Sequence, residues 1–312
     1  MHRPVALGLA AAVALGVVVY LFSGGAAGAR HAVGMRTWTI DYRAHDGHVR
    51  PAYVLLPAWY GPRRDPPLPL IISPHGRGVD GRMNVRLWTR VAARGRFAVV
   101  NPDGEGRRLA LYSWGDAGQI ADLARMPTLV RRALPWLRLA RDSTYAIGGS
   151  MGGQEALLLL ARAPRLLEGA AVVDPTTNLA LQYREFPELP CGAACRRTWK
   201  GAIGPGLQRL AQIEVGGTPR QAPTAYAARS PIHFVRQIAR SGVPLGLWWS
   251  RRDRIVGDPR LQEGGFLRVL ERLHPRARVL HVVGSWPHDR GLALNLAAAL
   301  AWLHLSLAPR SR

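Results

Sequence analysis

The sequence has 312 residues, of which 48% are hydrophobic and 20% charged, which excludes a disulfide-rich mini-protein, a globally disordered chain and a polytopic membrane protein. Lys and Arg number 42 against 20 Asp and Glu, a net charge of +22, but the arginines are scattered and no zinc-finger spacing or RNA-binding signature accompanies them. We therefore expect no specific nucleic-acid partner, and only a weak attraction to anionic polymers or lipids of a cell envelope.

The amino-terminal segment has the pattern of an export signal. A short basic start precedes residues 5–22, which carry no charge, and residues 27–29 fit a small-x-small cleavage site. The apolar run is also just long enough to cross a bilayer as a helix. Residues 1–29 are therefore predicted to be a cleaved signal peptide or an uncleaved membrane anchor. Both alternatives make residues 30–312 a secreted or envelope domain outside the cytoplasm.

Downstream, segments typical of strands and helices alternate. Residues 37–42 and 49–56, with a turn between them, predict an antiparallel hairpin. Apolar, β-branched runs predict further strands at residues 68–72, 97–100, 144–147, 170–173, 244–249 and 278–283. Helical segments lie between or after them at residues 84–93 (with Asn84 as the cap), 116–137, 152–163, 231–240, 262–273 and 290–305. This alternation predicts an α/β fold, a mostly parallel central sheet with helices on both faces.

One long stretch breaks the alternation. Residues 175–229 are rich in Pro, Gly, Thr and Arg and contain no recognisable motif. We predict that they form a cap-like insertion over one end of the sheet.

The strongest local motif follows the strand predicted at residues 144–147. Gly148, Ser150 and Gly152 form G-x-S-x-G, and an Ala- and Leu-rich helical segment comes next. Glycines allow the sharp strand-to-helix turn that exposes a serine Oγ, and the helix N-terminus directs free N–H groups at a developing oxyanion. We predict that Ser150 is a catalytic nucleophile. The alternative is a Gly-rich turn with an idle serine.

A serine hydroxyl needs a base to take its proton and an acid to orient that base. Asp253 follows the strand at residues 244–249, and His288 lies on a loop between the strand at residues 278–283 and the last helix. The carboxyl ends of parallel strands meet at one edge of a sheet, so we predict a triad of Ser150, Asp253 and His288. Alternatives for the acid are Asp174 and Asp258, and alternatives for the base are His274 and His281.

A second oxyanion donor is predicted at the carboxyl end of the strand at residues 68–72. That strand runs into HGRG at residues 75–78, an HG-type turn. The backbone N–H groups of Arg77 and Met151 would together form the oxyanion hole. His75 is predicted to brace the turn. The Arg77 side chain is a candidate for contact with an anionic substrate, and the alternative is an ordinary arginine.

The two cysteines, Cys191 and Cys195, lie close together in CGAAC. In an oxidising compartment this spacing favours a disulfide that closes a small loop. Free thiols and a metal site are the alternatives, but no further metal ligands lie near the pair. We predict a disulfide that stiffens the insertion.

Taken together, these motifs resemble the α/β-hydrolase superfamily. HGRG, GGSMGG, a strand-end aspartate and a histidine before the last helix occur in the order of that family. The segment at residues 230–256 also resembles the catalytic domain of prolyl-oligopeptidase-like hydrolases and related secreted esterases. The resemblance covers residues 37–305 and implies acyl transfer to water through an acyl-Ser150 intermediate, without cofactor or metal.

Within that family the sequence predicts a carboxylic-ester hydrolase acting on a small molecule. A peptidase or amidase acting on small peptides is the first alternative. The second is a non-catalytic binding protein on the same scaffold, because a fold does not prove an activity.

Overall fold

The computed structural model describes residues 34–63, 65–305 and 307. The signal or anchor predicted at residues 1–29 lies outside the described residues. Within the described part of the chain, no helix combines the length and the apolar character needed to cross a membrane.

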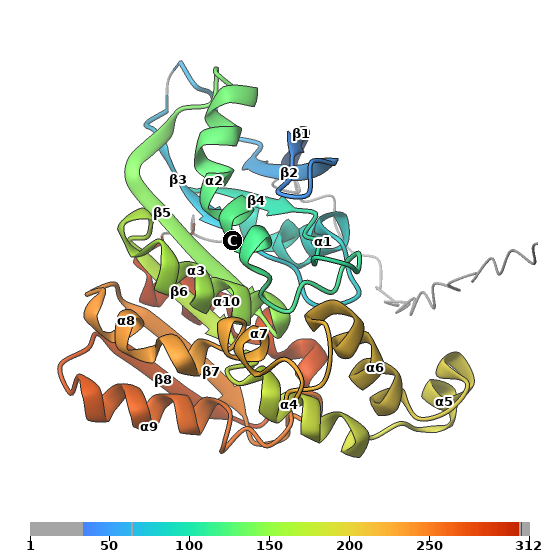
Figure 1. The fold of residues 1–312 in the computed structure, drawn as a ribbon. Coiled ribbons are helices and arrows are strands. Elements are labelled where there is room, and N and C mark those ends of the chain that lie inside the picture. Colours follow the sequence, from blue (N-terminus) through green and yellow to red (C-terminus); the bar gives the residue numbers. More distant parts are fainter. Residues whose placement is uncertain (1–33, 64, 306, 308–312) are drawn as a thin grey trace, which may run out of the picture.

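The described chain forms one sheet of eight strands in the order β1-β2-β4-β3-β5-β6-β7-β8 (Figure 1). The β1–β2 and β2–β4 pairings are antiparallel, and all later pairings are parallel, as the sequence predicts. The strands are β1 (Met35–Arg43), β2 (Val49–Pro57), β3 (Leu68–Ile72), β4 (Ala98–Pro102), β5 (Leu139–Gly149), β6 (Gly169–Val173), β7 (Leu245–Ser250) and β8 (Val279–Gly284).

Helices connect the parallel strands and cover both faces of the sheet. They are α1 (Gly81–Ala92), α2 (Ala117–Ala133), α3 (Met151–Arg162), α4 (Leu179–Glu185), α5 (Ala193–Trp199), α6 (Ile203–Val215), α7 (Pro223–Ala228), α8 (Val235–Arg240), α9 (Glu263–Leu273) and α10 (His288–Trp302). Short 3-10 turns are η1 (Pro164–Leu166), η2 (Phe186–Glu188) and η3 (Pro231–Phe234).

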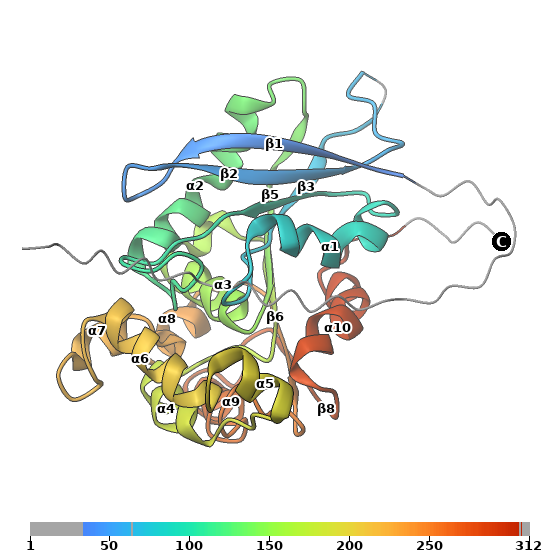
Figure 2. The ribbon, with the colours of Figure 1, turned by 90° about the vertical axis from the view of Figure 1, so that its right-hand side faces the viewer.

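Strand residues alternate between two apolar cores because successive side chains of a strand point to opposite faces. Leu70 and Ile72 of β3 join the core under α2, α3, α8 and α9, while Ile71 joins the core under α1 and α10. Leu247 and Trp248 of β7 divide in the same way. Figure 2 shows α1 and α10 on one side of the sheet and α2, α3 and α8 on the other. The apolar runs in the sequence therefore belong to strands that are buried on both faces.

The first helix begins earlier than predicted. The sequence placed a helix at residues 84–93 with Asn84 as its cap, but α1 begins at Gly81. The Asp80 carboxylate caps it by accepting a hydrogen bond from an N–H of the first turn at 2.6 Å. Asn84 lies buried inside α1 and donates to the backbone and side-chain oxygens of Ser73, at 3.0 Å each.

Three later boundaries also differ. The helix predicted at residues 116–137 ends at Ala133, two residues before Pro135, which disfavours the helical conformation in the residue before it. Residues 231–240 divide into the 3-10 turn η3 and the short helix α8. His288 is the first residue of α10 and not part of a loop, because the proline directly before it has the fixed φ that suits a helix start.

Residues 175–229, called the cap below, are helical and have an apolar cluster of their own. Helices α4, α6 and α7 contribute to this cluster, which also includes Trp114 and Met151 of the main domain. Figure 1 shows the cap helices gathered at one end of the sheet, with α5 at the outer edge of the group. The cap is therefore packed onto the loop that contains Trp114 and onto the start of α3.

The predicted disulfide is present. Cys191 and Cys195 are bonded to each other, with Cα atoms 5.3 Å apart, at the entrance to α5. None of the described α5 side chains belongs to the apolar cluster of the cap. The bridge therefore restrains a segment whose described side chains lie outside that cluster.

Reducing this disulfide is expected to loosen the cap locally and to change the melting temperature of the domain very little. The bridged loop is short, so it constrains the unfolded chain by about 2 kcal/mol at most. Arg196 and Arg197 are exposed on α5, and trypsin should cut there faster after reduction. Mass spectrometry of timed digests gives the rate. A Cys191→Ser/Cys195→Ser variant should be cut equally fast without reductant, and equal rates for bridged and reduced protein would contradict the prediction.

Candidate active site

Ser150 occupies the sharp turn between β5 and α3. Its φ is 55° and its ψ is −128°, a region that non-glycine residues rarely adopt and that costs about 1–3 kcal/mol. Hydrogen bonds on both sides hold this conformation. The Ser150 N–H donates to the Val173 carbonyl at 3.0 Å, and the Ser150 carbonyl accepts from the Gln154 N–H at 3.0 Å. The half-buried serine is thus fixed at the carboxyl edge of the sheet.

The two glycines of the motif are needed for close backbone contact. A Cβ on Gly148 would lie 2.4 Å from the Gly152 carbonyl oxygen, across the turn. A Cβ on Gly152 would lie 2.3 Å from the Pro74 carbonyl oxygen, in the HG-type turn. Any side chain at either position would push these backbones apart. The start of α3 and the turn at residues 74–77 therefore adjoin only because both positions are glycine.

The two predicted oxyanion donors lie beside Ser150. Met151 is the first residue of α3, so its N–H has no acceptor within the helix. Neither this N–H nor that of Arg77 donates a hydrogen bond to any residue the structure describes. Ser150, Met151 and Arg77 line the same small hollow. Two free N–H groups beside a candidate nucleophile suit a developing negative oxygen.

His288 and Asp253 form a direct hydrogen bond. The His288 Nδ1 atom lies 2.7 Å from Asp253 Oδ2. An ionised carboxylate only accepts, so Nδ1 carries the proton and Nε2 is left free to accept one. The other oxygen, Asp253 Oδ1, accepts from the N–H groups of Ile255 at 2.8 Å and Val256 at 3.1 Å. The Asp253 side chain is fully buried, and these three donors compensate its charge.

Asp174, the rival acid in the sequence, has other partners. Its carboxylate accepts from the Ser250 N–H at 2.8 Å and from the Trp286 indole N–H at 2.7 Å. Burial, together with the negative charge of Asp253, raises the pKa of Asp174 from 3.8 to about 6. Asp174 therefore holds the segment that leads into His288, while Asp253 makes the hydrogen bond to the imidazole.

The space around Ser150 is unequal on its two sides. A cavity of about 360 Å³ is lined by Ser150 and His288 together with Arg77, Val173 and Leu292. Toward the cap, the hollow that Ser150 shares with Trp114 and Phe186 has a volume of only about 10 Å³. That is room for about one water molecule. Any larger substrate group must therefore occupy the larger cavity in this conformation.

His75 braces the HG-type turn, as predicted. Its Nδ1 lies 2.8 Å from the Gly76 carbonyl oxygen, and its Nε2 accepts from the Gly104 N–H at 2.9 Å. This pattern assigns the proton to Nδ1, because Nε2 faces a donor. Burial lowers the pKa of His75, which favours the neutral ring that these two bonds require.

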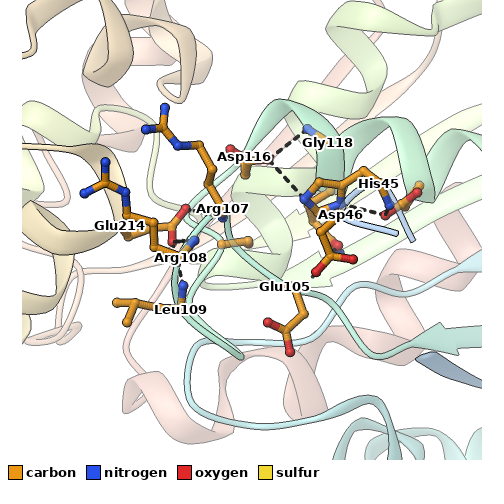
Figure 3. A network of polar contacts seen from close by, with 12 residues as sticks. His45, Asp46, Glu105, Arg107, Arg108, Leu109, Asp116, Gly118 and Glu214 are labelled. Carbon is orange, nitrogen blue, oxygen red and sulfur yellow. Dashed lines mark hydrogen bonds and ion pairs between the residues drawn. The ribbon is translucent and has the colours of Figure 1, made fainter. Parts of the chain in front are cut away.

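A buried carboxylate attaches the cap to the loop that follows β4. Glu214 of α6 accepts from three consecutive backbone N–H groups of that loop, those of Arg107, Arg108 and Leu109, at 2.7 to 3.0 Å. Figure 3 shows Glu214 facing this backbone, with Asp116 and His45 farther along the same network. Arg229 lies between the acids, 3.0 Å from Glu214 and 2.8 Å from Asp116. The cap is therefore fastened by charge as well as by apolar contact.

The same loop contacts Met151, one of the two predicted oxyanion donors. The Trp114 N–H lies 3.4 Å from the Met151 sulfur, and the Ser113 hydroxyl lies 3.7 Å from it. Glu214 and Arg229 fix this loop, and the loop in turn contacts Met151. A contiguous set of contacts thus links the cap to the turn that contains Ser150.

Glu155 of α3, the helix that follows Ser150, is buried. It accepts a hydrogen bond from the Ser113 hydroxyl and another from Gln119. Burial raises its pKa from 4.5 to about 7, although both hydrogen bonds act in the opposite direction. Folding therefore favours the protonated form of this side chain.

This raised pKa predicts a loss of stability with rising pH. The folded protein binds the Glu155 proton more tightly than the unfolded chain, so the contribution of Glu155 to stability is complete below about pH 4.5 and is lost as the pH rises through about 7. The full effect is about 3 kcal/mol. Urea unfolding of wild type and Glu155→Gln at pH 5 and pH 8 measures it. The variant should lose less stability between the two values, and an equal loss would contradict the prediction. Burial also raises the pKa values of Asp174 and Glu263, so part of the fall in stability with rising pH remains in both proteins.

Asp174, Asp253 and His288 also have possible metal-ligand atoms within 4.8 Å of one another, which is close enough for a metal site. The Asp253–His288 distance of 2.7 Å is that of a hydrogen bond, whereas two ligands of one tetrahedral zinc lie about 3.3 Å apart. Both oxygens of Asp174 already accept N–H groups. The donor set does not fit a metal ion and instead forms an acid–base pair with a supporting carboxylate.

Sequence reasoning named the residues that meet at this edge but missed those that support them. Trp286 and Glu214 carried no recognisable signal, since their partners lie more than 100 positions away in the sequence. Asp174 was identified only as a rival acid. The sequence signal for its actual position is its place directly after β6, the strand next to β5.

No family model matches the sequence, and no curated protein matches it significantly.

Many solved structures match the fold. An acylaminoacyl peptidase from Pyrococcus horikoshii is 14% identical with a TM-score of 0.62, and the match covers 86% of this chain and 39% of that one. S-formylglutathione hydrolase FrmB from Staphylococcus aureus is 16% identical with a TM-score of 0.60, covering 86% and 98%. Brefeldin A esterase, a bacterial homologue of human hormone sensitive lipase, is 19% identical with a TM-score of 0.62, covering 89% and 77%. The chain thus spans about two fifths of the peptidase and nearly all of the formylglutathione hydrolase.

Proposed function

Because the chain has the α/β-hydrolase fold, we propose that it is a serine hydrolase that cleaves carboxylic esters through an acyl-Ser150 intermediate. The observation that carries the proposal is the arrangement around the larger cavity. A serine in a strained turn shares this cavity with a histidine whose other nitrogen is hydrogen-bonded to a buried aspartate.

Each group has a defined part in the proposed reaction. His288 Nε2 takes the Ser150 proton as Oγ attacks the ester carbon, and the Arg77 and Met151 N–H groups stabilise the resulting oxyanion. His288 then gives the proton to the departing alcohol oxygen. A water molecule, deprotonated by the same nitrogen, attacks the acyl-enzyme and releases the carboxylic acid and free Ser150. Asp253 orients the imidazole and stabilises its protonated form.

A small ester is preferred as substrate because of the size of the cavity beside Ser150. The cavity of about 360 Å³ lies in the usual range for a small-molecule site. This volume supports a small ester as substrate.

Labelling and a substrate panel test the proposal together. A fluorophosphonate probe should label one peptide, the one that contains Ser150. Aryl esters should turn over faster than aminoacyl anilides. Faster cleavage of the anilides would favour a peptidase, and labelling without turnover of either class would favour a binding protein. A chelator should leave the activity unchanged.

We also propose that residues 1–29 direct export, as a cleaved signal or an anchor. The Cys191–Cys195 disulfide supports this proposal because such bonds persist in oxidising compartments. Cell fractionation with N-terminal sequencing of the mature protein tests it. Full-length protein in the cytoplasm would contradict both forms of the proposal.

A further inference from the structure

Arg77 lines the larger cavity beside Ser150, and its side chain makes no ion pair with any residue that the structure describes. Arg77 lines this cavity and also the small hollow under the cap, so it lies between the two spaces that meet at the nucleophile. No described carboxylate lies within ion-pair distance of it, and no described residue accepts a hydrogen bond from its side chain. By contrast, the buried Arg229 makes two ion pairs and a hydrogen bond to the Ser113 carbonyl.

Two nearby groups stabilise the charge of Arg77. It interacts with the Asp253 carboxylate and the Tyr112 hydroxyl, and burial lowers its pKa. A guanidinium remains protonated in proteins, so this group keeps a positive charge, and the Asp253 carboxylate that stabilises it lies beyond ion-pair distance. Holding a cation partly out of water without a counter-ion is unfavourable. An anion that enters the cavity would remove that cost.

The rest of the cavity lining does not supply the anion. The lining is largely apolar, with Val79, Leu87, Val173 and Leu292 among its residues. Asp289 provides a carboxylate, but it is exposed, where water screens its charge.

We propose that Arg77 binds an anionic group of the substrate, so that the natural ester carries a carboxylate or similar oxyanion on the part that occupies the larger cavity. This inference rests on the proposed function and specifies its substrate class. The planar guanidinium can donate two parallel hydrogen bonds to a carboxylate, which gives orientation as well as affinity. The backbone N–H of Arg77 and its side chain would then act on two parts of one substrate, the reacting carbonyl and the remote anion.

Two matched pairs of esters test the proposal, each differing by a carboxylate in place of a methyl group. Mono-4-nitrophenyl adipate against 4-nitrophenyl hexanoate places the anion on the acyl side. 4-Acetoxybenzoate against 4-methylphenyl acetate places it on the alcohol side. The readout is the ratio of kcat/KM within a pair. Any disturbance of the oxyanion hole in a variant lowers kcat/KM for both members of a pair, so its effect cancels in this ratio.

In one of the two pairs, Arg77→Gln should lower the anionic-to-neutral ratio by about 10- to 100-fold, the range for a lost charge-assisted hydrogen bond. Arg77→Lys should retain part of the preference. Arg86→Gln removes the same charge from the exposed face of α1 and should leave both ratios unchanged. Asp289→Asn should change the ratio little, because water screens this exposed carboxylate.

Equal ratios in wild type and Arg77→Gln for both pairs would overturn the proposal, as would an equal fall in Arg86→Gln. A second measurement needs no turnover. Monomethyl adipate should protect Ser150 from fluorophosphonate labelling, and Arg77→Gln should require about 10- to 100-fold more of it for the same protection. Failure of the proposed function has a different signature, in which no ester is cleaved and Ser150 is not labelled.

Discussion

Replacing Ser150 with alanine should lower kcat/KM for an aryl ester by about 10⁵- to 10⁶-fold. The variant keeps the oxyanion donors, the cavity and the base but has no oxygen to form the acyl-enzyme. The removed hydroxyl makes no hydrogen bond that the structure describes, so the fold should persist with a melting temperature within a few degrees of wild type. Initial rates with 4-nitrophenyl acetate and intact-mass spectra after fluorophosphonate treatment measure the loss.

A matched serine makes this result specific. Ser285 is exposed, on the loop that precedes His288, and Ser285→Ala should keep near-normal activity and full labelling. Near-normal activity of Ser150→Ala, or labelling of any other residue, would show that the chemistry takes place elsewhere.

The second large effect separates the two buried acids. Asp253→Asn should reduce kcat by about 10³- to 10⁴-fold, because an amide cannot stabilise the protonated imidazole and favours the wrong tautomer. Asp174→Asn should reduce kcat by about tenfold or less. Its cost falls mainly on stability, about 1–3 kcal/mol, because both Asp174 oxygens face N–H donors and an amide NH₂ would oppose one of them.

Steady-state kinetics and urea unfolding of both variants give the comparison. Asparagine tolerates positive φ, so the backbone of residue 174, with φ at 46°, does not confound the result. A much larger loss of kcat in Asp174→Asn than in Asp253→Asn would transfer the orienting role to Asp174.

Much of the fold could be predicted because its signals are local. The strands of the parallel sheet were located within two residues, since runs such as Leu68–Ile72 have the apolar, β-branched character of buried strands. The exception is β5, which begins five residues before the predicted strand at residues 144–147. Errors concentrated at the helix ends. Asp80 and Asn84 are both good capping residues, and only the packing of Asn84 against Ser73 decides between them. The cap was not predicted as helical, because its short helices depend on a shared cluster with Trp114 and Met151.

In the candidate site, too, the features with a local sequence signal could be predicted. The G-x-S-x-G motif determines its own geometry, since Gly148 and Gly152 must approach other backbone atoms closely wherever this turn occurs. Strand order then predicted that Ser150, Asp253 and His288 meet at one edge of the sheet, because parallel strands end together.

The contacts between distant segments were decided only by the tertiary structure. Asp253 and Asp174 are both buried aspartates that follow strands, and the sequence could not show that Asp253 bonds to His288 while Asp174 bonds to Trp286. Nor could it distinguish Arg77, which lies beside Ser150 and has no described ion-pair partner, from Arg229, which is paired with two acids. The physical reason is that a residue's pattern along the chain reflects its own backbone and burial. The partner of a charge depends on which segments the folded sheet and cap bring within about 3 Å of it.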